Sequence, residues 1–277
     1  MSKLVLPVAC FAAGAAASLL LERRWPRHRL RHMAHDLQRA LRHDEFEVHY
    51  QPLVDLRRGQ WMGFEALIRW RNRNGSYISP ELFLPVAVEA GLIELISERV
   101  VELVARDMLP VLRRRSDLHV GINVPPDLLG RGALGVIAAR CGLLAQVTQV
   151  IIEITETGLV DDLGREAVHT ARALGARVAI DDFGTGLNGL AQLQDLEIDF
   201  IKIDKSFVRK IGSASPGAKL VDAIVTIARD IGAATIAEGV ETPMQAEYLR
   251  RLGVEFGQGW LYAKALPMRE VLSRLSG

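Results

Sequence analysis

The chain has 277 residues, of which 49% are hydrophobic and 24% charged, a composition typical of a globular protein with one large core. Its two cysteines, Cys10 and Cys141, are too far apart in sequence for a metal-binding pair or a disulfide framework. The 34 basic and 33 acidic residues are unevenly distributed, because residues 1–43 are strongly basic and the remainder is mildly acidic. No basic stretch is interleaved with aromatic residues, so we expect neither DNA nor RNA as a partner.

The first segment, residues 4–21, is apolar and carries no charge. As a helix it would span roughly 27 Å, close to a bilayer core of about 30 Å. Arginines follow it between residues 23 and 31, and the positive-inside rule then places the rest of the chain in the cytoplasm. We therefore expect residues 1–22 to be an uncleaved single-pass anchor. A cleaved signal peptide is the alternative, because residues 15–17 resemble a cleavage site.

Residues 23–43 are predicted to form a basic juxtamembrane helix. Met33, Ala34, Leu37 and Leu41 recur at helical spacing. Four of the seven histidines also fall here, and we interpret them as part of a solvated helical face beside lipid headgroups rather than as a pH sensor. The helix is expected to act as a connector and to offer a possible dimer contact.

From residue 47 onward, short apolar runs alternate with helical patterns. The predicted strands are Glu47–Leu56, Trp61–Trp70, His119–Val124, Val147–Thr155, Arg177–Asp182, Phe200–Asp204, Ala234–Glu238 and Glu255–Trp260. The predicted helices are Pro80–Leu112 in two pieces broken at Ala90 and Gly91, Pro126–Cys141, Leu163–Leu174, Gly189–Leu196, Pro216–Ile231 and Pro243–Leu252.

This alternation predicts an α/β fold, a modified (β/α)8 TIM-type barrel. The turn at Arg57–Gln60 joins the first two strands into a hairpin, which makes one barrel strand antiparallel. A doubly wound open sheet is the alternative architecture. Thr242, Pro243 and Gln245 predict a capped start for the last of these helices.

Asp181 and Asp182 end the buried run Arg177–Ile180 and are followed by Phe183-Gly184-Thr185-Gly186. Adjacent carboxylates are costly to bury without a positive charge between them, so this stretch suggests a metal site. A solvated acidic turn is the alternative interpretation of the stretch taken alone.

Polar residues also lie at the ends of the other predicted strands, which share one face in a barrel. They are Glu65, Arg69, Asn123, Glu153, Glu156, Asp181, Asp182, Lys202, Asp204, Glu238 and Glu241. A set of carboxylates and one amide, without histidine, suits Mg²⁺ or Mn²⁺ better than zinc.

Seven short sequence blocks resemble the signature blocks of the EAL-domain family and occur in the same order as in that family. The blocks are residues 50–55, 64–70, 153–156, 181–186, 201–207, 237–242 and 258–260, and the resemblance covers residues 37–275. It implies a bacterial phosphodiesterase that hydrolyses cyclic di-GMP to linear pGpG with two divalent cations, Mg²⁺ or Mn²⁺. It also implies that the protein is a homodimer. With the anchor at residues 1–22, the expected location is the bacterial inner membrane, with the catalytic domain in the cytoplasm.

The resemblance assigns roles to individual residues. Metal ligands would be Glu65, Asn123, Glu153, Asp181, Asp182 and Glu238, with Asp181 bridging both cations. Lys202 would orient the attacking water with help from Asp204, and Glu238 would take part in catalysis. Gln51, Arg69 and Gln258 would contact or support the substrate, Glu156 would brace the loop after Asp182, and Glu241 would support the site from behind.

The sequence departs from the family pattern at three places: Leu187-Asn188-Gly189, Val124-Pro125 and Ala265. None of them removes an expected metal ligand. The altered loop at residues 187–189 keeps open an alternative, in which a weakly active or inactive domain acts as a receptor for cyclic di-GMP.

Overall fold

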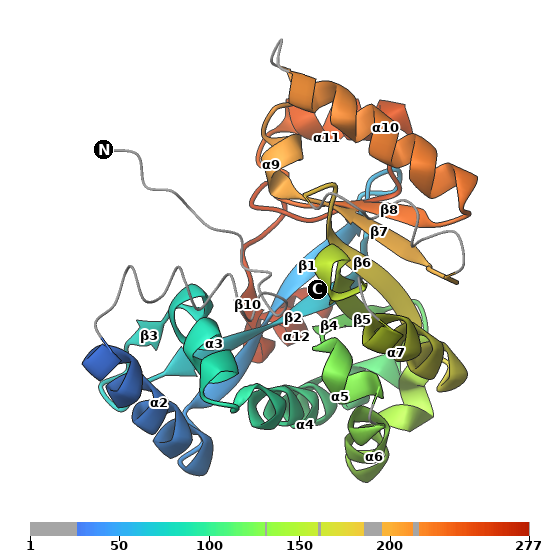
Figure 1. Cartoon of the computed structure of the whole chain (residues 1–277). Helices are drawn as coiled ribbons and strands as arrows, with labels where there is room; N and C mark the ends of the chain where they lie inside the picture. The colour runs from blue at the N-terminus through green and yellow to red at the C-terminus, as the bar shows by residue number, and fades with distance from the viewer. Residues whose placement is uncertain (1–26, 131, 160–161, 186–195, 213–215, 277) are drawn as a thin grey trace.

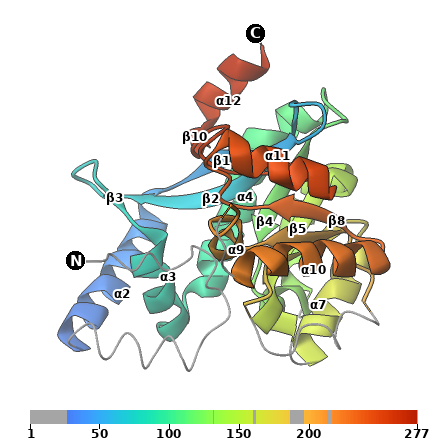
Figure 2. The ribbon, with the colours of Figure 1, turned by 90° about the horizontal axis from the view of Figure 1, so that it is seen from above.

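The computed structural model describes residues 27–130, 132–159, 162–185, 196–212 and 216–276. Its strands form a closed eight-stranded barrel, with helices around the outside (Figures 1 and 2). The barrel strands are β1 (Phe46–Asp55), β2 (Trp61–Arg71), β4 (His119–Asn123), β5 (Val150–Thr155), β6 (Arg177–Phe183), β7 (Phe200–Ile203), β8 (Ala234–Ala237) and β9 (Phe256–Gly257). Two short strands, β3 (Tyr77–Ile78) and β10 (Leu266–Pro267), extend the sheet beside β2 and β1.

The barrel closes through β1, which pairs antiparallel with both β2 and β9. Every pairing from β2 through β4 to β9 is parallel. The predicted hairpin and single antiparallel strand are therefore confirmed, and the open-sheet alternative is excluded because the two ends of the sheet meet at β1 and β2.

The helices surround this ring. They are α2 (Arg27–Arg42), α3 (Pro80–Glu89), α4 (Ile93–Leu112), α5 (Pro126–Gly130), α6 (Ala133–Arg140), α7 (Asp162–Ala173), α9 (Lys205–Val208), α10 (Pro216–Asp230), α11 (Pro243–Leu252) and α12 (Met268–Leu275), with 3₁₀ turns at Leu143–Gln149 and Glu156–Leu159. Figure 1 places α2, α3 and α4 along one side of the barrel and α9, α10 and α11 along the opposite side.

Most predicted elements match their observed bounds within a few residues, and the exceptions have local causes. The predicted helix Pro126–Cys141 is two helices, α5 and α6, and the chain enters α6 through Gly132 with a left-handed backbone, φ 70°. The strand predicted from Val147 begins at Val150, because residues 143–149 form a 3₁₀ turn. Most of the predicted helix Gly189–Leu196 lies outside the described residues. The capping box of Thr242 and Gln245 at the start of α11 is confirmed.

Helix α2 packs onto the barrel domain. Leu37 and Ala40 are fully buried, and the helix contacts α3 and α4. The amphipathic pattern seen in the sequence is thus used for packing within the same chain, because burying one apolar stripe stabilises a surface helix.

The prediction of a single-pass inner-membrane protein is corrected by the structure. Within the described ranges, no helix combines the length and the apolar character needed to cross a bilayer. The longest helix, α4, has 20 residues but carries charges along its length, from Glu94 to Asp107. The apolar segment at residues 4–21, on which the membrane anchor and the membrane contact were predicted, lies outside the described residues.

Candidate functional site

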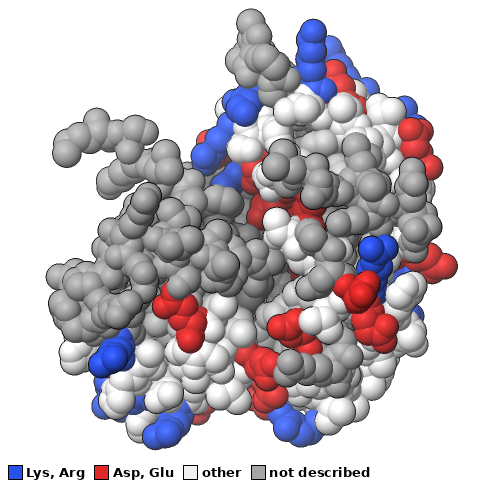
Figure 3. Space-filling view, viewed as in Figure 1, with Lys and Arg blue, Asp and Glu red and all other residues white. Residues whose placement is uncertain are grey.

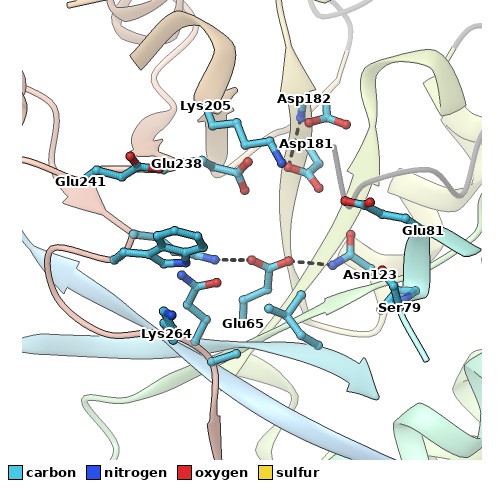
Figure 4. Close-up of a pocket in the computed structure, with 18 of the residues that line it drawn as sticks. Glu65, Ser79, Glu81, Asn123, Asp181, Asp182, Lys205, Glu238, Glu241 and Lys264 are labelled. Atoms are coloured by element: carbon cyan, nitrogen blue, oxygen red, sulfur yellow. Dashed lines mark hydrogen bonds between the residues drawn. The ribbon is translucent and has the colours of Figure 1, made fainter. Parts of the chain in front are cut away.

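The polar residues predicted at the strand ends meet at one mouth of the barrel. Glu65 comes from β2, Asn123 from β4, Glu153 from β5, Asp181 from β6 and Lys202 from β7. Glu238 and Gln258 follow β8 and β9 directly. A cavity of about 590 Å³ opens over this cluster, and Figure 4 shows residues that line it. In the space-filling view of Figure 3, acidic side chains are visible in a hollow of the face seen in Figure 1.

Lys202 lies at the centre of the cluster. Its Nζ is 2.7 Å from Glu153 Oε2, 3.0 Å from Asp181 Oδ1 and 2.8 Å from Glu238 Oε1. Glu65 Oε2 lies further away, at 3.6 Å. The Lys202 side chain is fully buried, so these carboxylates replace the water that would otherwise solvate its ammonium group.

Several buried carboxylates share one ammonium group, and the pKa values of Glu153, Asp182 and Glu238 are raised. Burial raises the pKa of Glu153 to about 8, against the attraction of Lys202. Burial and the neighbouring Asp181 raise the pKa of Asp182 to about 8, and burial raises the pKa of Glu238 well above its usual value. Burial would lower the pKa of Lys202, but Asp181, Glu153 and the other carboxylates outweigh it and raise that pKa strongly.

Glu65 differs from these neighbours because two amide groups donate to it. Asn123 Nδ2 donates to Glu65 Oε1 at 2.9 Å, and Gln258 Nε2 donates to Glu65 Oε2 at 2.5 Å. Burial opposes ionisation of Glu65, but Lys202 and these two amides together lower its pKa. Glu65 is thus ionised, and the two amide groups fix the orientation of its carboxylate.

The residues present fit a divalent cation. Asp181, Asp182 and Glu238 each offer an oxygen, and these three oxygens lie within 4.8 Å of one another. Glu153 Oε1 and Asp182 Oδ1 are buried, and neither has a hydrogen-bond partner among the described residues. Buried carboxylate oxygens with free lone pairs beside other oxygens are the donors that Mg²⁺ and Mn²⁺ prefer.

Asp182, near the end of β6, has an unusual backbone conformation. Asp182 has φ 54°, in the left-handed region that few residues other than glycine adopt. Its N–H donates to Asp181 Oδ1 at 3.0 Å, and Thr185 Oγ1 donates to its carbonyl at 2.8 Å. The solvated-turn alternative is wrong, because Asp181 is 1% exposed and Asp182 is 8% exposed.

Gln51 and Arg69 line the cavity at β1 and β2, as expected for residues that contact a ligand. Gln51 Nε2 lies 3.5 Å from the carbonyl of Ala263. Arg69 donates to the carbonyl of Ile68 at 2.9 Å, and burial lowers the pKa of its guanidinium. Among the described residues, the Ile68 carbonyl is the one hydrogen-bond acceptor of the Arg69 side chain, which leaves its other N–H groups available to an anion.

The other predicted residues lie around the cluster. Glu156 Oε2 accepts from the Gly184 N–H at 2.9 Å, so Glu156 contacts the turn it was expected to brace. Glu241 lines the cavity and lies 3.5 Å from Arg209. Asp204 caps α9 by accepting from the Ser206 N–H at 2.9 Å, and no ion pair joins it to Lys202 in the described part of the chain.

Sequence reasoning missed residues whose importance depends on proximity. Gly121 on β4 is one, because a Cβ there would lie 2.1 Å from Glu153 Oε1. Its only signal in the sequence is a glycine inside an apolar strand, which indicates the close approach of another group. Cavity-lining residues from loops and helix starts were also missed: Ser79, Glu81, Lys205, Arg209, Trp260 and Lys264.

Comparison with known proteins identifies the family of this chain. A family model described as "EAL domain" matches residues 34–265, which is most of the chain. The chain belongs to the EAL domain family. The resemblance noted from the sequence blocks is therefore confirmed over the whole barrel.

Individual EAL proteins extend the comparison. The chain is 37% identical over 241 residues to the probable cyclic di-GMP phosphodiesterase PdeB of Escherichia coli, covering 86% of this chain and 46% of PdeB. It is 33% identical over 243 residues to the cyclic di-GMP phosphodiesterase NbdA of Pseudomonas aeruginosa, covering 85% of this chain and 31% of NbdA. The chain thus spans less than half the length of these curated relatives.

A solved structure, the PaMucR phosphodiesterase in complex with c-di-GMP, has the same fold. It superposes with a TM-score of 0.79 at 35% identity, over 87% of this chain and 99% of the other. The barrel described here therefore matches, nearly from end to end, a domain that carries cyclic di-GMP in its own structure.

Proposed function

We propose that this EAL domain hydrolyses cyclic di-GMP to linear 5′-pGpG. The observation that carries the proposal is the convergence of Glu65, Glu153, Asp181 and Glu238 around the buried Lys202 ammonium. The names of PdeB and NbdA and the ligand of the PaMucR structure support cyclic di-GMP as the substrate. The cavity of about 590 Å³ lies within the range of volumes that bind small molecules.

We propose that the domain holds two divalent cations, Mg²⁺ or Mn²⁺. One would bind to Glu65, Asn123, Glu153 and Asp181, and the other to Asp181, Asp182 and Glu238. When bound, the cations supply Lewis-acid stabilisation of the charge on the phosphate and on the attacking and leaving oxygens. Their positive charge would also offset the carboxylate surplus that raises the pKa of Glu153 and Asp182.

The residues of the chain then perform the remaining tasks. Three carboxylates fix the position of the Lys202 ammonium group, and its positive charge orients the attacking water. Glu238 lies beside Lys202 at the cavity wall and helps to hold the same water. Asp204 begins the helix that follows Lys202 and keeps this end of β7 in place.

Arg69 and Gln51 hold the nucleotide on the opposite wall of the cavity. The planar guanidinium of Arg69 can donate two hydrogen bonds to one phosphate. Gln258 supports this wall indirectly, because its amide donates to Glu65. Glu156 accepts from the Gly184 N–H in the turn after β6, and the Glu241 backbone N–H donates to Gln245 of α11; these contacts keep the ligands of the second cation in place.

The test is direct. The purified full-length chain is incubated with cyclic di-GMP and either Mg²⁺ or Mn²⁺, and the products are separated by chromatography. We expect pGpG from the wild type and none from Glu65→Gln, with Lys219→Met on the exposed surface of α10 as the control. Intact cyclic di-GMP after prolonged incubation with both metals would refute the phosphodiesterase. Tight binding without turnover would instead favour the receptor alternative.

The family resemblance also leads us to propose that the chain forms a homodimer. Sedimentation of the purified chain, with and without cyclic di-GMP, measures its mass in solution. A monomer under both conditions would refute this proposal without affecting the one on catalysis.

A further inference from the structure

Lys205 is a cavity-lining cation that the proposed mechanism does not use. It is the first residue of α9, directly after Asp204 and three positions after the buried Lys202. It is half-buried and lines the same cavity as Asp182 and Glu238. In the close-up of Figure 4, its side chain extends from α9 towards the acidic residues.

The ammonium group of Lys205 is not neutralised by a direct contact. Among the residues that the structure describes, no carboxylate forms an ion pair with it, although its charge lowers the pKa of Asp182 slightly from the raised value. The ammonium group of a half-buried lysine that lines a cavity and has no ion-pair partner is a ready contact for an anion that enters the cavity.

The stem of Lys205 is held by packing against Gly239. Gly239 has φ +64°, and a Cβ at this position would lie 2.6 Å from Lys205 Cβ. Gly239 directly follows Glu238, so the missing side chain leaves the space through which Lys205 passes beside the acidic cluster. The start of the Lys205 side chain is therefore positioned by the contact between Gly239, after β8, and the first residue of α9.

Lys205 and Arg69 lie on opposite sides of the barrel mouth. Arg69 is on β2, and Lys205 follows β7. In the closed ring β1-β2-β4-β5-β6-β7-β8-β9, these two strands are four positions apart, which is half of the circumference. The acidic cluster lies between them, so an elongated ligand that crosses the mouth meets Arg69 at one side and Lys205 at the other.

We propose that Lys205 binds one of the two phosphates of the cyclic dinucleotide while Arg69 binds the other. This inference rests on the proposed function, because it takes cyclic di-GMP as the ligand. Lys202 cannot take this role, since three carboxylates already surround its ammonium group at 3.0 Å or less. Lysine suits the task because its ammonium group is a compact charge that binds phosphate without a fixed orientation.

A purely structural role for Lys205 makes the opposite prediction. If its charge only offsets Asp182 and the neighbouring carboxylates, removing the charge would strengthen cation binding and leave substrate binding unchanged. A phosphate contact instead predicts weaker substrate binding, because the ligand loses a charge-assisted hydrogen bond.

The experiment uses the full-length chain with saturating Mn²⁺ and compares Lys205→Met, which keeps the apolar stem, with Lys205→Arg, which keeps the charge. Lys219→Met, on the exposed surface of α10, is the matched control for the loss of one positive charge. We expect KM for cyclic di-GMP to rise about 10- to 100-fold in Lys205→Met and to stay constant in the control. In Lys205→Arg, KM should return most of the way to the wild-type value.

A double-mutant cycle tests the assignment of separate phosphates. Contacts to two different phosphates are expected to be independent, so the effects of Lys205→Met and Arg69→Met on KM should multiply in the double variant. An unchanged KM in Lys205→Met, accompanied by tighter Mn²⁺ binding, would overturn the proposal, as would a double variant no worse than either single variant.

Failure of the proposed function gives a different result. If the wild type binds cyclic di-GMP without hydrolysing it, the same comparison is made with dissociation constants measured by titration, and the same outcomes decide. If the wild type neither binds nor hydrolyses cyclic di-GMP, the proposed function fails, and the assignment of Lys205 to a phosphate of that ligand is overturned with it.

Discussion

The Nζ of Lys202 lies 2.7 Å from Glu153 Oε2, and both side chains are fully buried at the carboxyl ends of β7 and β5. Glu153 has one oxygen on this ammonium group and the other, Oε1, without a hydrogen-bond partner among the described residues. One oxygen of Glu153 therefore binds the Lys202 ammonium group, and the other is available to a bound metal cation. Both tasks depend on the ammonium group staying in place.

Removal of that ammonium group is expected to cost both activity and stability. Lys202→Met leaves Glu153, Asp181 and Glu238 without their shared partner, and breaking a buried ion pair costs about 3–5 kcal/mol in the free energy of unfolding. We also expect kcat to fall about 100-fold or more, because water is no longer oriented. Urea unfolding and steady-state kinetics measure the two effects.

A second substitution separates the two effects of that change. Lys202→Arg keeps a positive charge among the carboxylates but moves the donor groups. We expect it to recover part of the stability and little of the activity. Full activity in Lys202→Arg would contradict the role given to the ammonium group in orienting water.

Cation binding is expected to depend on pH with a definite sign. Glu153 and Asp182 have pKa values of about 8 in the cation-free protein, far above those of the unfolded chain. Above about pH 4.5 the unfolded chain loses these protons while the folded chain keeps them, so these two groups lower the stability progressively up to about pH 8. Bound Mn²⁺ removes this penalty, because it requires the ionised carboxylates.

The measurement is the increase in melting temperature that Mn²⁺ produces. We expect this increase to grow between about pH 6 and about pH 8 and to level off at higher pH. In Asp182→Asn, which has one ionisable ligand fewer, the dependence should be shallower. An increase that is constant over this range would contradict proton release from Glu153 and Asp182.

Gly121 is expected to be essential for placing Glu153. In Gly121→Ala, the new Cβ would lie 2.1 Å from Glu153 Oε1, so the carboxylate must move. Changes of this kind beside a metal ligand typically cost about 10- to 100-fold in metal affinity or activity. Titration with Mn²⁺, followed by the change in melting temperature, measures the loss of affinity.

Gly135 on α6 offers a matched control for this substitution. A Cβ at Gly135 would lie 3.5 Å from the side chain of Leu174, an ordinary contact distance. Gly135→Ala should therefore leave Mn²⁺ affinity unchanged and raise the stability by up to about 1 kcal/mol, because alanine favours the helix. Equal Mn²⁺ affinities in the two variants would show that the space at Gly121 is not needed.

The contact between Glu156 and Gly184 is expected to hold the turn after β6 in place. Glu156→Ala removes the acceptor at 2.9 Å from the Gly184 N–H. We expect faster hydrogen exchange at the Gly184 amide and a reduced kcat, because Asp182 lies two residues before Gly184, near the end of β6. Glu156→Gln keeps an acceptor oxygen and should preserve much of both properties. Unchanged exchange in Glu156→Ala would contradict the bracing role.

Most of the fold could be predicted from the sequence, because local patterns determine its elements. The alternation of apolar runs and helical patterns predicted the barrel strands, and Arg57–Gln60 predicted the hairpin that makes β1 antiparallel. The strand boundaries were less accurate at β5 and β9, where a 3₁₀ turn and a tight turn take residues from the apolar runs. The short strands β3 and β10 have no local signal, since they form only by pairing with β2 and β1.

The sequence by itself determined which residues could carry the chemistry: Asp181, Asp182, Glu65, Glu153 and Lys202 lie at the ends of buried strands, and the ends of parallel strands share one face. Only the tertiary structure decided their distances and charge states. Lys202 lies at the centre of the cluster because closure of the barrel brings four carboxylates around it. The roles of Gly121 and Lys205 likewise depend on side chains that approach from other strands, which no local pattern encodes.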